Sequence, residues 1–184
     1  MKILEITKSG IGNYQKLTQL DMAETRAMYA EEGILLPTDE QLEFELDSDW
    51  AILENQIEVH VKAKNKDGIY WLHFKFIRGF VWDLASVPKF FRGIVDNDDP
   101  SIIVASAVHD SCFTGHLVSF HDSNDLLRAI ARFYGASWIK AWIYWAAVST
   151  PFGRYMYNRV TTKRNAWQLK YVDYKVEKII AGRS

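Results

Sequence analysis

The chain has 184 residues, of which 48% are hydrophobic and 14% aromatic, and its formal net charge is −1. This hydrophobic content excludes a chain that stays disordered over most of its length. The small net charge argues against a protein that coats nucleic acid by charge alone. The length suits one folded unit, so we expect a single domain over residues 1–184.

The single cysteine, Cys112, excludes an intramolecular disulfide and is typical of a reducing compartment. The first ten residues lack the apolar core of a signal peptide. The most apolar stretch, residues 138–148, is interrupted by Lys140 and falls short of the about 20 residues that a membrane span requires. We therefore expect a soluble, cytoplasmic protein without a transmembrane segment.

Charge is distributed unevenly along the chain. Residues 33–61 contain eight carboxylates and no Lys or Arg, whereas residues 154–184 contain eight Lys or Arg and two carboxylates. Either the two ends meet in the fold, or the basic tail is available to an anionic partner, or both are ordinary solvated faces.

The N-terminal half predicts a helix and then a small antiparallel sheet. Residues 13–32 carry helix formers and end at Gly33, a suitable C-cap, so we expect a helical arm over residues 1–33. Alternating apolar residues predict strands at residues 41–54, 56–63 and 70–77. An Asp-Gly turn joins the last two strands, which makes them the clearest hairpin in the chain.

The C-terminal half predicts helices. They are expected at residues 88–95, from Pro100 onward, at residues 124–133 after an N-cap at Ser123, and from Ser137 to about residue 149. In the last of these, Trp138, Trp142 and Trp145 share one face, which we expect to lie in the core. The basic tail, residues 154–184, is also expected to be helical. The predicted fold class is α+β, with a small antiparallel sheet in the N-terminal half packed on a helical C-terminal half.

Two polar clusters in the apolar stretch 82–113 form the candidate site. They are Asp83-Leu-Ala-Ser86-Val-Pro88 and Ala107-Val-His109-Asp110. Neighbours on a helix point about 100° apart, so we do not expect His109 and Asp110 to bond directly. His109 suits a general base and Asp110 a metal ligand, while Asp125 on the next predicted helix suits a carboxylate that orients the ring. Asp122 is the alternative orienting residue.

Other interpretations of these residues remain open. His109 and Asp110 suit a buried structural hydrogen-bond network as well as they suit catalysis. Asp83 and Ser86 match a capped turn, and with the acidic residues 96–99 they also offer oxygen ligands for Ca²⁺. Three further residues are supporting candidates: Cys112 as a thiol nucleophile, and His116 and His121 as metal ligands together with His109. Ser86 with His109 permits a serine-hydrolase triad, but there is no nucleophile-elbow motif.

The two motifs, D-x-A-S-x-P at residues 83–88 and A-x-H-D at residues 107–110, resemble an uncharacterised domain family common in tailed phages and prophages. Members of that family usually carry Tyr where Phe113 stands. The resemblance implies a phage-encoded protein, working in the host cytoplasm, without assigning a biochemical activity.

His109-Asp110-x-x-Phe113, followed by Asp125 on the next helix, is also similar to the active-site helices of secreted phospholipase A2. That resemblance implies that His109 activates water, Asp110 binds Ca²⁺ and Asp125 orients His109. The disulfides and the glycine-rich calcium loop of that family are absent from the sequence.

Two functions follow as hypotheses. The first is a phage-encoded hydrolase-like protein that uses His109 and Asp125 with Ca²⁺ at Asp110 and Asp83. The alternative is a non-catalytic phage assembly factor or modulator of a host protein, in which the same cluster is structural.

Overall fold

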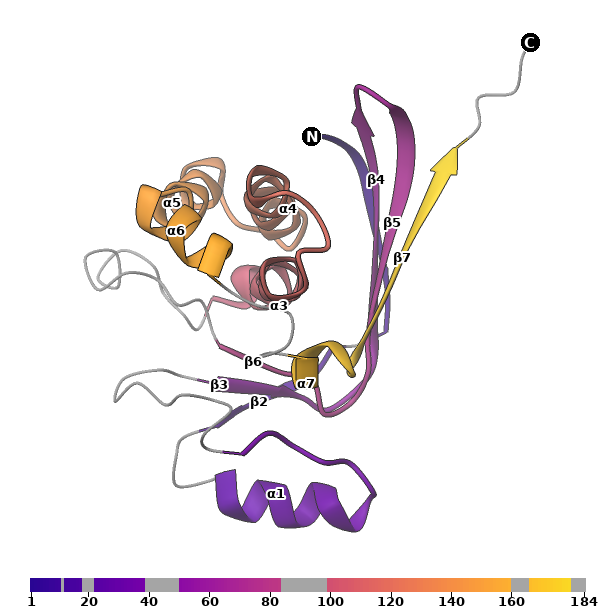
Figure 1. Cartoon of the computed structure of the whole chain (residues 1–184), viewed down its shortest axis with the longest axis vertical. Coiled ribbons are helices and arrows are strands. Elements are labelled where there is room, and N and C mark those ends of the chain that lie inside the picture. Colours follow the sequence, from indigo (N-terminus) through magenta and orange to yellow (C-terminus); the bar gives the residue numbers. More distant parts are fainter. Residues whose placement is uncertain (11, 18–21, 39–49, 84–98, 160–165, 180–184) are drawn as a thin grey trace.

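A computed structural model of the chain describes residues 1–10, 12–17, 22–38, 50–83, 99–159 and 166–179. Antiparallel sheets come mostly from the N-terminal half and helices from the C-terminal half, which confirms the predicted α+β class. A four-stranded sheet stands along one side of the helices, and a three-stranded sheet lies at one end of it (Figure 1).

The four-stranded sheet has the order β1-β4-β5-β7, with every pair antiparallel. Its strands are β1 (Lys2–Ser9), β4 (Ile57–Asn65), β5 (Gly68–Phe76) and β7 (Val172–Ile179). The β4–β5 pair is the predicted hairpin. Asn65 pairs with Gly68, and the Asn65 side chain accepts the Asp67 backbone N–H at 2.8 Å. Gly68 has φ +136°, a conformation that glycine adopts without a Cβ penalty, and this confirms the turn.

Both edges of this sheet differ from the prediction. Residues 2–9 form strand β1 and not part of a helical arm, and residues 172–179 of the expected helical tail form strand β7. Each edge strand pairs with a segment far away in the sequence: β7 runs along β5 from Phe76 to Ile69. In β7, the apolar residues Val172, Tyr174 and Val176 alternate with charged residues, which is the local pattern of a strand with one exposed face, and the pairing with β5 places this strand at the edge of the sheet.

The second sheet has the order β2-β3-β6, formed by β2 (Tyr14–Leu17), β3 (Trp50–Leu53) and β6 (Val81–Asp83). The expectation of one helix over residues 13–32 is therefore wrong at its start and confirmed from α1 (Met22–Glu31) onward. Gly33 has φ +77°, as expected of a C-cap glycine. Of the strand expected at residues 41–54, only β3 falls within the described residues.

Strand β3 is buried on both faces. Ile52 packs with Met22 and Tyr29 of α1, whereas Ala51 and Leu53 belong to the main core with Trp82. A strand buried on both sides is a continuous apolar run, as Ala51-Ile-Leu53 is. Helix α1 therefore covers the outer face of the small sheet, and α3 lies on its inner side (Figure 1).

The helices of the C-terminal half are α3 (Pro100–Gly115), α4 (Phe120–Phe133), α5 (Trp138–Val148), α6 (Pro151–Arg159) and α7 (Ala166–Leu169). Asp99 caps α3 with Pro in its first turn, and Ser137 caps α5, both close to the prediction. Helix α4 begins one turn earlier than predicted because Ser119, not Ser123, is its N-cap. Ser123 is buried inside the helix and bonds back to the Phe120 carbonyl at 2.8 Å. The helix expected at residues 88–95 lies outside the described residues.

The main core fills the space between the four-stranded sheet and the helices α3 and α4. It contains the inward residues of β4 and β5, such as Val59 and Phe74, together with Val108 and Ile130. Within the described part of the chain, no helix is both long and apolar enough to cross a membrane.

The tryptophan face of α5 is the largest error of the packing prediction. The buried residues of α5 are Ala141, Tyr144 and Ala147, whereas Trp138 is 65% exposed and Trp142 is also exposed. Spacing shows which residues share a face of a helix, but a helix that is apolar all round does not show which face is covered. Here Ala141, Tyr144 and Ala147 form the buried face, Trp138 and Trp142 lie outside, and Trp145 is partly buried.

Candidate functional site

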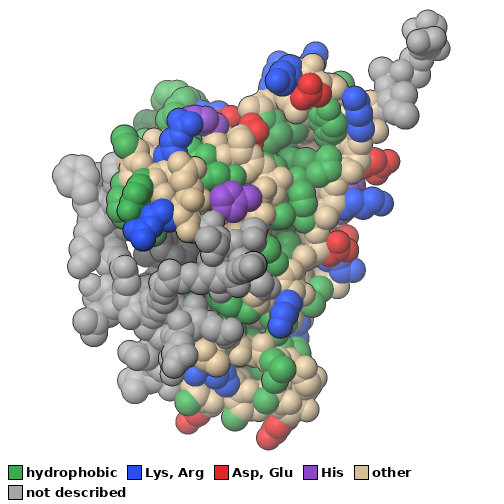
Figure 2. All heavy atoms as spheres, viewed as in Figure 1, with side chains coloured by type: hydrophobic (Ala, Val, Ile, Leu, Met, Phe, Trp, Pro, Cys, Tyr) green, Lys and Arg blue, Asp and Glu red, His purple; other side chains and the backbone are tan. Residues whose placement is uncertain are grey.

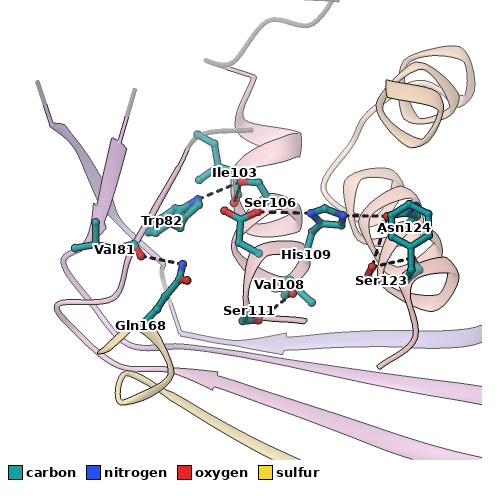
Figure 3. Close-up of polar contacts among 12 residues, drawn as sticks. Val81, Trp82, Ile103, Ser106, Val108, His109, Ser111, Ser123, Asn124 and Gln168 are labelled. Atoms are coloured by element: carbon teal, nitrogen blue, oxygen red, sulfur yellow. Dashed lines mark hydrogen bonds and ion pairs between the residues drawn. The ribbon is translucent and has the colours of Figure 1, made fainter. Parts of the chain in front are cut away.

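His109 lies in the third turn of α3, on the side that meets α4. The residue is 8% exposed, and its Nε2 lies 3.0 Å from the side-chain oxygen of Asn124 on α4 (Figure 3). Asn124 is fully buried. A hydrogen bond between two buried polar groups therefore joins the two helices that make the most extensive contact in the helical half.

Asn124 also fixes the tautomer of the ring. Its amide nitrogen donates to the hydroxyl of Ser149, the C-cap residue of α5, at 3.0 Å. The amide oxygen therefore faces His109 and can only accept, so the ring carries a hydrogen on Nε2. The chain His109–Asn124–Ser149 thereby links α3, α4 and the end of α5.

Asp110 lies beside the other ring nitrogen. Its Oδ1 is 3.5 Å from His109 Nδ1, which is within ion-pair distance of a protonated ring, so the two neighbours approach each other more closely than expected. The two side chains leave the helix in different directions, but both are long enough to bend toward each other. An amide thus holds Nε2, and a carboxylate stands next to Nδ1.

Asp125, the expected orienting carboxylate, has other partners. Its Oδ1 lies 3.3 Å from Arg128, and its Oδ2 lies 3.5 Å from the N-terminal amine of Met1. Asp122 pairs with the same amine at 2.7 Å and with Ser119 at the start of α4. Asn124, and not Asp125, lies four residues after Phe120 and three before Leu127 on the buried stripe of α4. The position that faces His109 is therefore one residue earlier than predicted.

The supporting candidates lie in three separate places. Cys112 is fully buried in the core, and this burial raises the pKa of its thiol well above the usual range, which disfavours the thiolate that a nucleophile needs. His116 ends α3 in a left-handed conformation with φ +49°, and its exposed ring lies 4.4 Å from that of Tyr157. His121 is exposed in the first turn of α4.

Only some of the residues that were expected to bind a metal ion lie in the described part of the chain. Among the residues that the structure describes, no three His, Cys, Asp or Glu side chains are arranged to hold a metal ion. Asp83 ends β6, where its backbone pairs with Trp50, but its side chain lies outside the described residues, as do Ser86 and residues 96–98. Asp99, the last residue of the acidic loop, caps α3.

A hydrogen bond that the sequence did not reveal joins the two motifs. The indole Nε1 of Trp82 donates to Ser106 at 3.1 Å, and Ser106 donates to the Ile103 carbonyl at 2.8 Å (Figure 3). Trp82 directly precedes the first motif, and Ser106 directly precedes the second. Ser106 and Asn124 are polar residues inside apolar helical stretches. Because buried polar groups need hydrogen-bond partners, their positions in the sequence could have indicated these bonds.

A cavity among the described residues lies away from His109. It measures about 290 Å³ and lies between the four-stranded sheet and the start of α4, with a lining that includes Tyr70, Val118, Asp122 and Tyr174. His109 and Asp110 do not line it. The His109 cluster is thus a buried polar network between helices in the part of the chain that is described.

Comparison with known proteins finds a match that covers the part of the chain that contains the His109 cluster. No curated protein and no solved structure matches the chain. One family model does match, over residues 50–148, which run from β3 to the end of α5 and include both motifs and the His109–Asn124 pair. Because this match covers more than half of the sequence, the chain belongs to the family described as "Protein of unknown function (DUF1353)".

Proposed function

We propose that the protein is a non-catalytic binding protein in which the His109 network holds the helical half together. The single observation that carries this proposal is the buried hydrogen bond between His109 Nε2 and Asn124, extended to Ser149. A buried polar network whose members are all bonded rigidifies a core, whereas a catalytic base needs one nitrogen aimed at a site that a substrate can enter.

The electrostatics of the neighbouring residues support a structural role. The expected second carboxylate, Asp125, pairs with Arg128 and the N-terminal amine, and the nearby thiol of Cys112 is buried with a raised pKa. The Asp125 carboxylate is therefore occupied by other ion pairs, and the Cys112 thiol is held in its unreactive protonated form. The resemblance of the two motifs to a domain family of tailed phages favours a phage or host component as the partner.

A hydrolase-like site is the second candidate, and one observation favours it. Because Asn124 fixes the hydrogen on Nε2, Nδ1 of His109 is the nitrogen that could accept a proton from water, with the partly exposed Asp110 beside it. In this scheme Asn124 takes the orienting role that the phospholipase A2 likeness gave to Asp125. Asp110, with the side chain of Asp83, would supply the oxygen ligands for Ca²⁺.

Two substitutions of His109 separate the candidates. His109→Ala removes the ring, whereas His109→Gln retains an amide N–H that can donate to Asn124 but offers no base. A structural role predicts that His109→Ala lowers the melting temperature, that His109→Gln restores part of the loss, and that the wild-type protein cleaves no ester or phospholipid substrate. Hydrolysis by the wild type that folded His109→Gln lacks would overturn the proposal and establish the second candidate.

A further inference from the structure

The outward face of α5 is almost entirely apolar. Trp138, Ile139, Trp142 and Ala146 lie on this face, and Trp138 and Ile139 are each 65% exposed. The opposite face, with Ala141, Tyr144 and Ala147, is buried against the rest of the protein. Large apolar side chains gathered on the surface of a soluble fold mark a contact site for another surface.

The next helix extends this apolar character. Helix α6 has no buried residue, and Phe152 is 62% exposed, with Tyr155 and Met156 also exposed. We call the exposed large hydrophobic residues of the two helices the α5–α6 surface: Trp138, Ile139, Trp142, Phe152, Tyr155 and Met156. Figure 2 shows hydrophobic and basic side chains together over these helices, at the upper left of the view.

The two helices themselves carry basic residues and no acidic ones: Lys140 on α5, and the exposed Arg154 and Arg159 on α6. Lys140 pairs with Asp99, so the arginines of α6 are the cations of this surface that pair with no carboxylate among the described residues. In the sequence, residues 126–172 contain eight Lys or Arg and no Asp or Glu. The whole chain is nearly neutral, so this stretch is a strong local excess of positive charge. Its partner should therefore be both apolar and anionic.

Two of these arginines lie directly beside aromatic rings of the surface. The guanidinium of Arg128 lies 4.4 Å from the ring centroid of Trp142, and Arg159 donates to the Tyr155 hydroxyl at 2.8 Å. Each helix thus presents an aromatic ring with a cation next to it. Indole and phenol rings favour the boundary between hydrocarbon and water, where an adjacent guanidinium can reach phosphate oxygens.

We propose that the α5–α6 surface binds the face of a lipid bilayer that contains anionic phospholipids. Trp138, Ile139 and Phe152 enter the boundary of the acyl chains, and the surrounding Arg and Lys side chains pair with headgroup phosphates. The protein lies on the bilayer without crossing it. This surface is distinct from the His109 network, so the inference holds whichever role His109 has.

Two other occupants fit the surface less well. Nucleic acid would match the cations and the rings, but it offers no apolar partner for Ile139, Phe152 and Met156. A second copy of the chain, docked through the same surface, would bring two sets of like charges together. Of these three occupants, the anionic bilayer is the one that matches both the apolar and the basic character.

The test is flotation of the full-length protein with vesicles of phosphatidylcholine alone and of phosphatidylcholine with phosphatidylglycerol. We expect binding to the anionic vesicles that is at least about tenfold stronger than to the neutral ones and that weakens at high salt. The apolar variant is Trp138→Ser with Ile139→Ser, and its control is Leu35→Ser, an apolar residue that is 79% exposed on another part of the chain. The first should abolish flotation and the second should leave it unchanged.

The charge variant is Arg154→Gln with Arg159→Gln, and its control is Lys66→Gln with Lys175→Gln, two exposed lysines of the four-stranded sheet and its turn. We expect the first pair to weaken binding about fivefold for each cation removed, and the control pair to have little effect. Absence of flotation with anionic vesicles, or equal loss in the control variants, would overturn the proposal. Tighter binding to an oligonucleotide than to vesicles would assign the surface to nucleic acid, and dimerisation abolished by the Trp138 variant would assign it to a second copy.

Discussion

The indole nitrogen of Trp82 donates a hydrogen bond to Ser106 at 3.1 Å, and both side chains are buried. Trp82 is the second residue of β6, and Ser106 lies in the middle of α3. The bond therefore joins the small sheet to the central helix at the point where the two motifs of the chain come together. Trp82 also stacks on Phe80 with a centroid distance of 5.5 Å, so the indole is held from both its edge and its face.

We predict that Ser106→Ala destabilises the protein by about 1–3 kcal/mol, because it leaves the buried Trp82 N–H without an acceptor. Ser111→Ala is a matched control in the same helix: Ser111 is also buried and also donates to the carbonyl three residues earlier, at 2.9 Å. No indole depends on Ser111 in the described residues, so its loss should cost less. Urea denaturation of the two variants measures the difference, and equal free energies of unfolding would contradict the prediction.

Asn124→Ala should destabilise the protein by about 1–3 kcal/mol or more, since it removes the partner of both His109 and Ser149 from a buried position. The matched control is Asp125→Asn, the next residue along α4. Asp125 is partly exposed and pairs with Arg128 at 3.3 Å, so its substitution should cost less than about 1 kcal/mol. Thermal denaturation of both variants is the measurement. A larger loss for Asp125→Asn would show that Asp125 supports the helix pair more than Asn124 does.

The sequence predicted those parts of the fold that depend on local signals. The hairpin of β4 and β5 has alternating side chains and an Asp-Gly turn, and α3 and α5 begin where Asp99 and Ser137 cap them. Strand β1 was missed because it is an edge strand with irregular alternation, stabilised by a partner distant in the sequence. Strand β7 was missed although Val172, Tyr174 and Val176 alternate with charged residues, because the basic character of the tail was given more weight than this period.

His109 lies on a helix as expected, but its partner on the next helix is Asn124 and not the predicted Asp125. Two serines four residues apart, Ser119 and Ser123, are equally good caps in the sequence, and the choice of Ser123 placed the helix start one turn late. Which α4 residue faces His109 depends on which face of α4 is buried, and that face contains Asn124 together with Phe120 and Leu127. The outward position of Trp138 and Trp142 was beyond prediction for a similar reason, because only tertiary contacts decide which face of an apolar helix is covered.

Tyr134→Phe should leave stability unchanged or raise it by up to about 1 kcal/mol. The Tyr134 hydroxyl is buried and has no hydrogen-bond partner among the described residues, so its removal relieves an unsatisfied polar group. The ring keeps its contact with Lys8, whose Nζ lies 4.8 Å from the centroid. Calorimetry measures the change, and a clear loss of melting temperature would show that the hydroxyl makes a stabilising bond.

The same substitution should alter the alkaline limit of stability. Burial raises the pKa of Tyr134 to about 12. Because the folded pKa is above that of the unfolded chain, the stability linked to the neutral phenol is full below about pH 10 and is lost as the pH rises toward 12. Tyr134→Phe should therefore unfold less steeply above pH 10 than the wild type, as followed by circular dichroism. Identical slopes would contradict the raised pKa.

We predict that Asp99 makes the stability of the fold sensitive to acid. Its carboxylate caps α3 by accepting the Ser101 N–H at 2.9 Å, and it reaches α5 by accepting from Tyr144 at 2.9 Å and pairing with Lys140. Burial by itself would raise the pKa of Asp99, but the bonds from Lys140, Ser101 and Tyr144 outweigh it and hold this pKa well below its usual range. The carboxylate thus joins the start of the central helix to the helix that carries the exposed tryptophans.

Because the pKa of Asp99 is lower in the folded protein than in the unfolded chain, its contribution is present above about pH 4 and is lost as the pH falls further. Asp99→Asn keeps the size and a cap acceptor but removes the charge, so the variant should be less stable at pH 7 and lose less stability between pH 4 and pH 2. Urea denaturation at several pH values measures both effects. Tyr144→Phe is the control that removes one bond and retains the charge, and its acid profile should remain close to that of the wild type. If Asp99→Asn and the wild type lost stability in parallel below pH 4, the acid sensitivity would belong to other carboxylates.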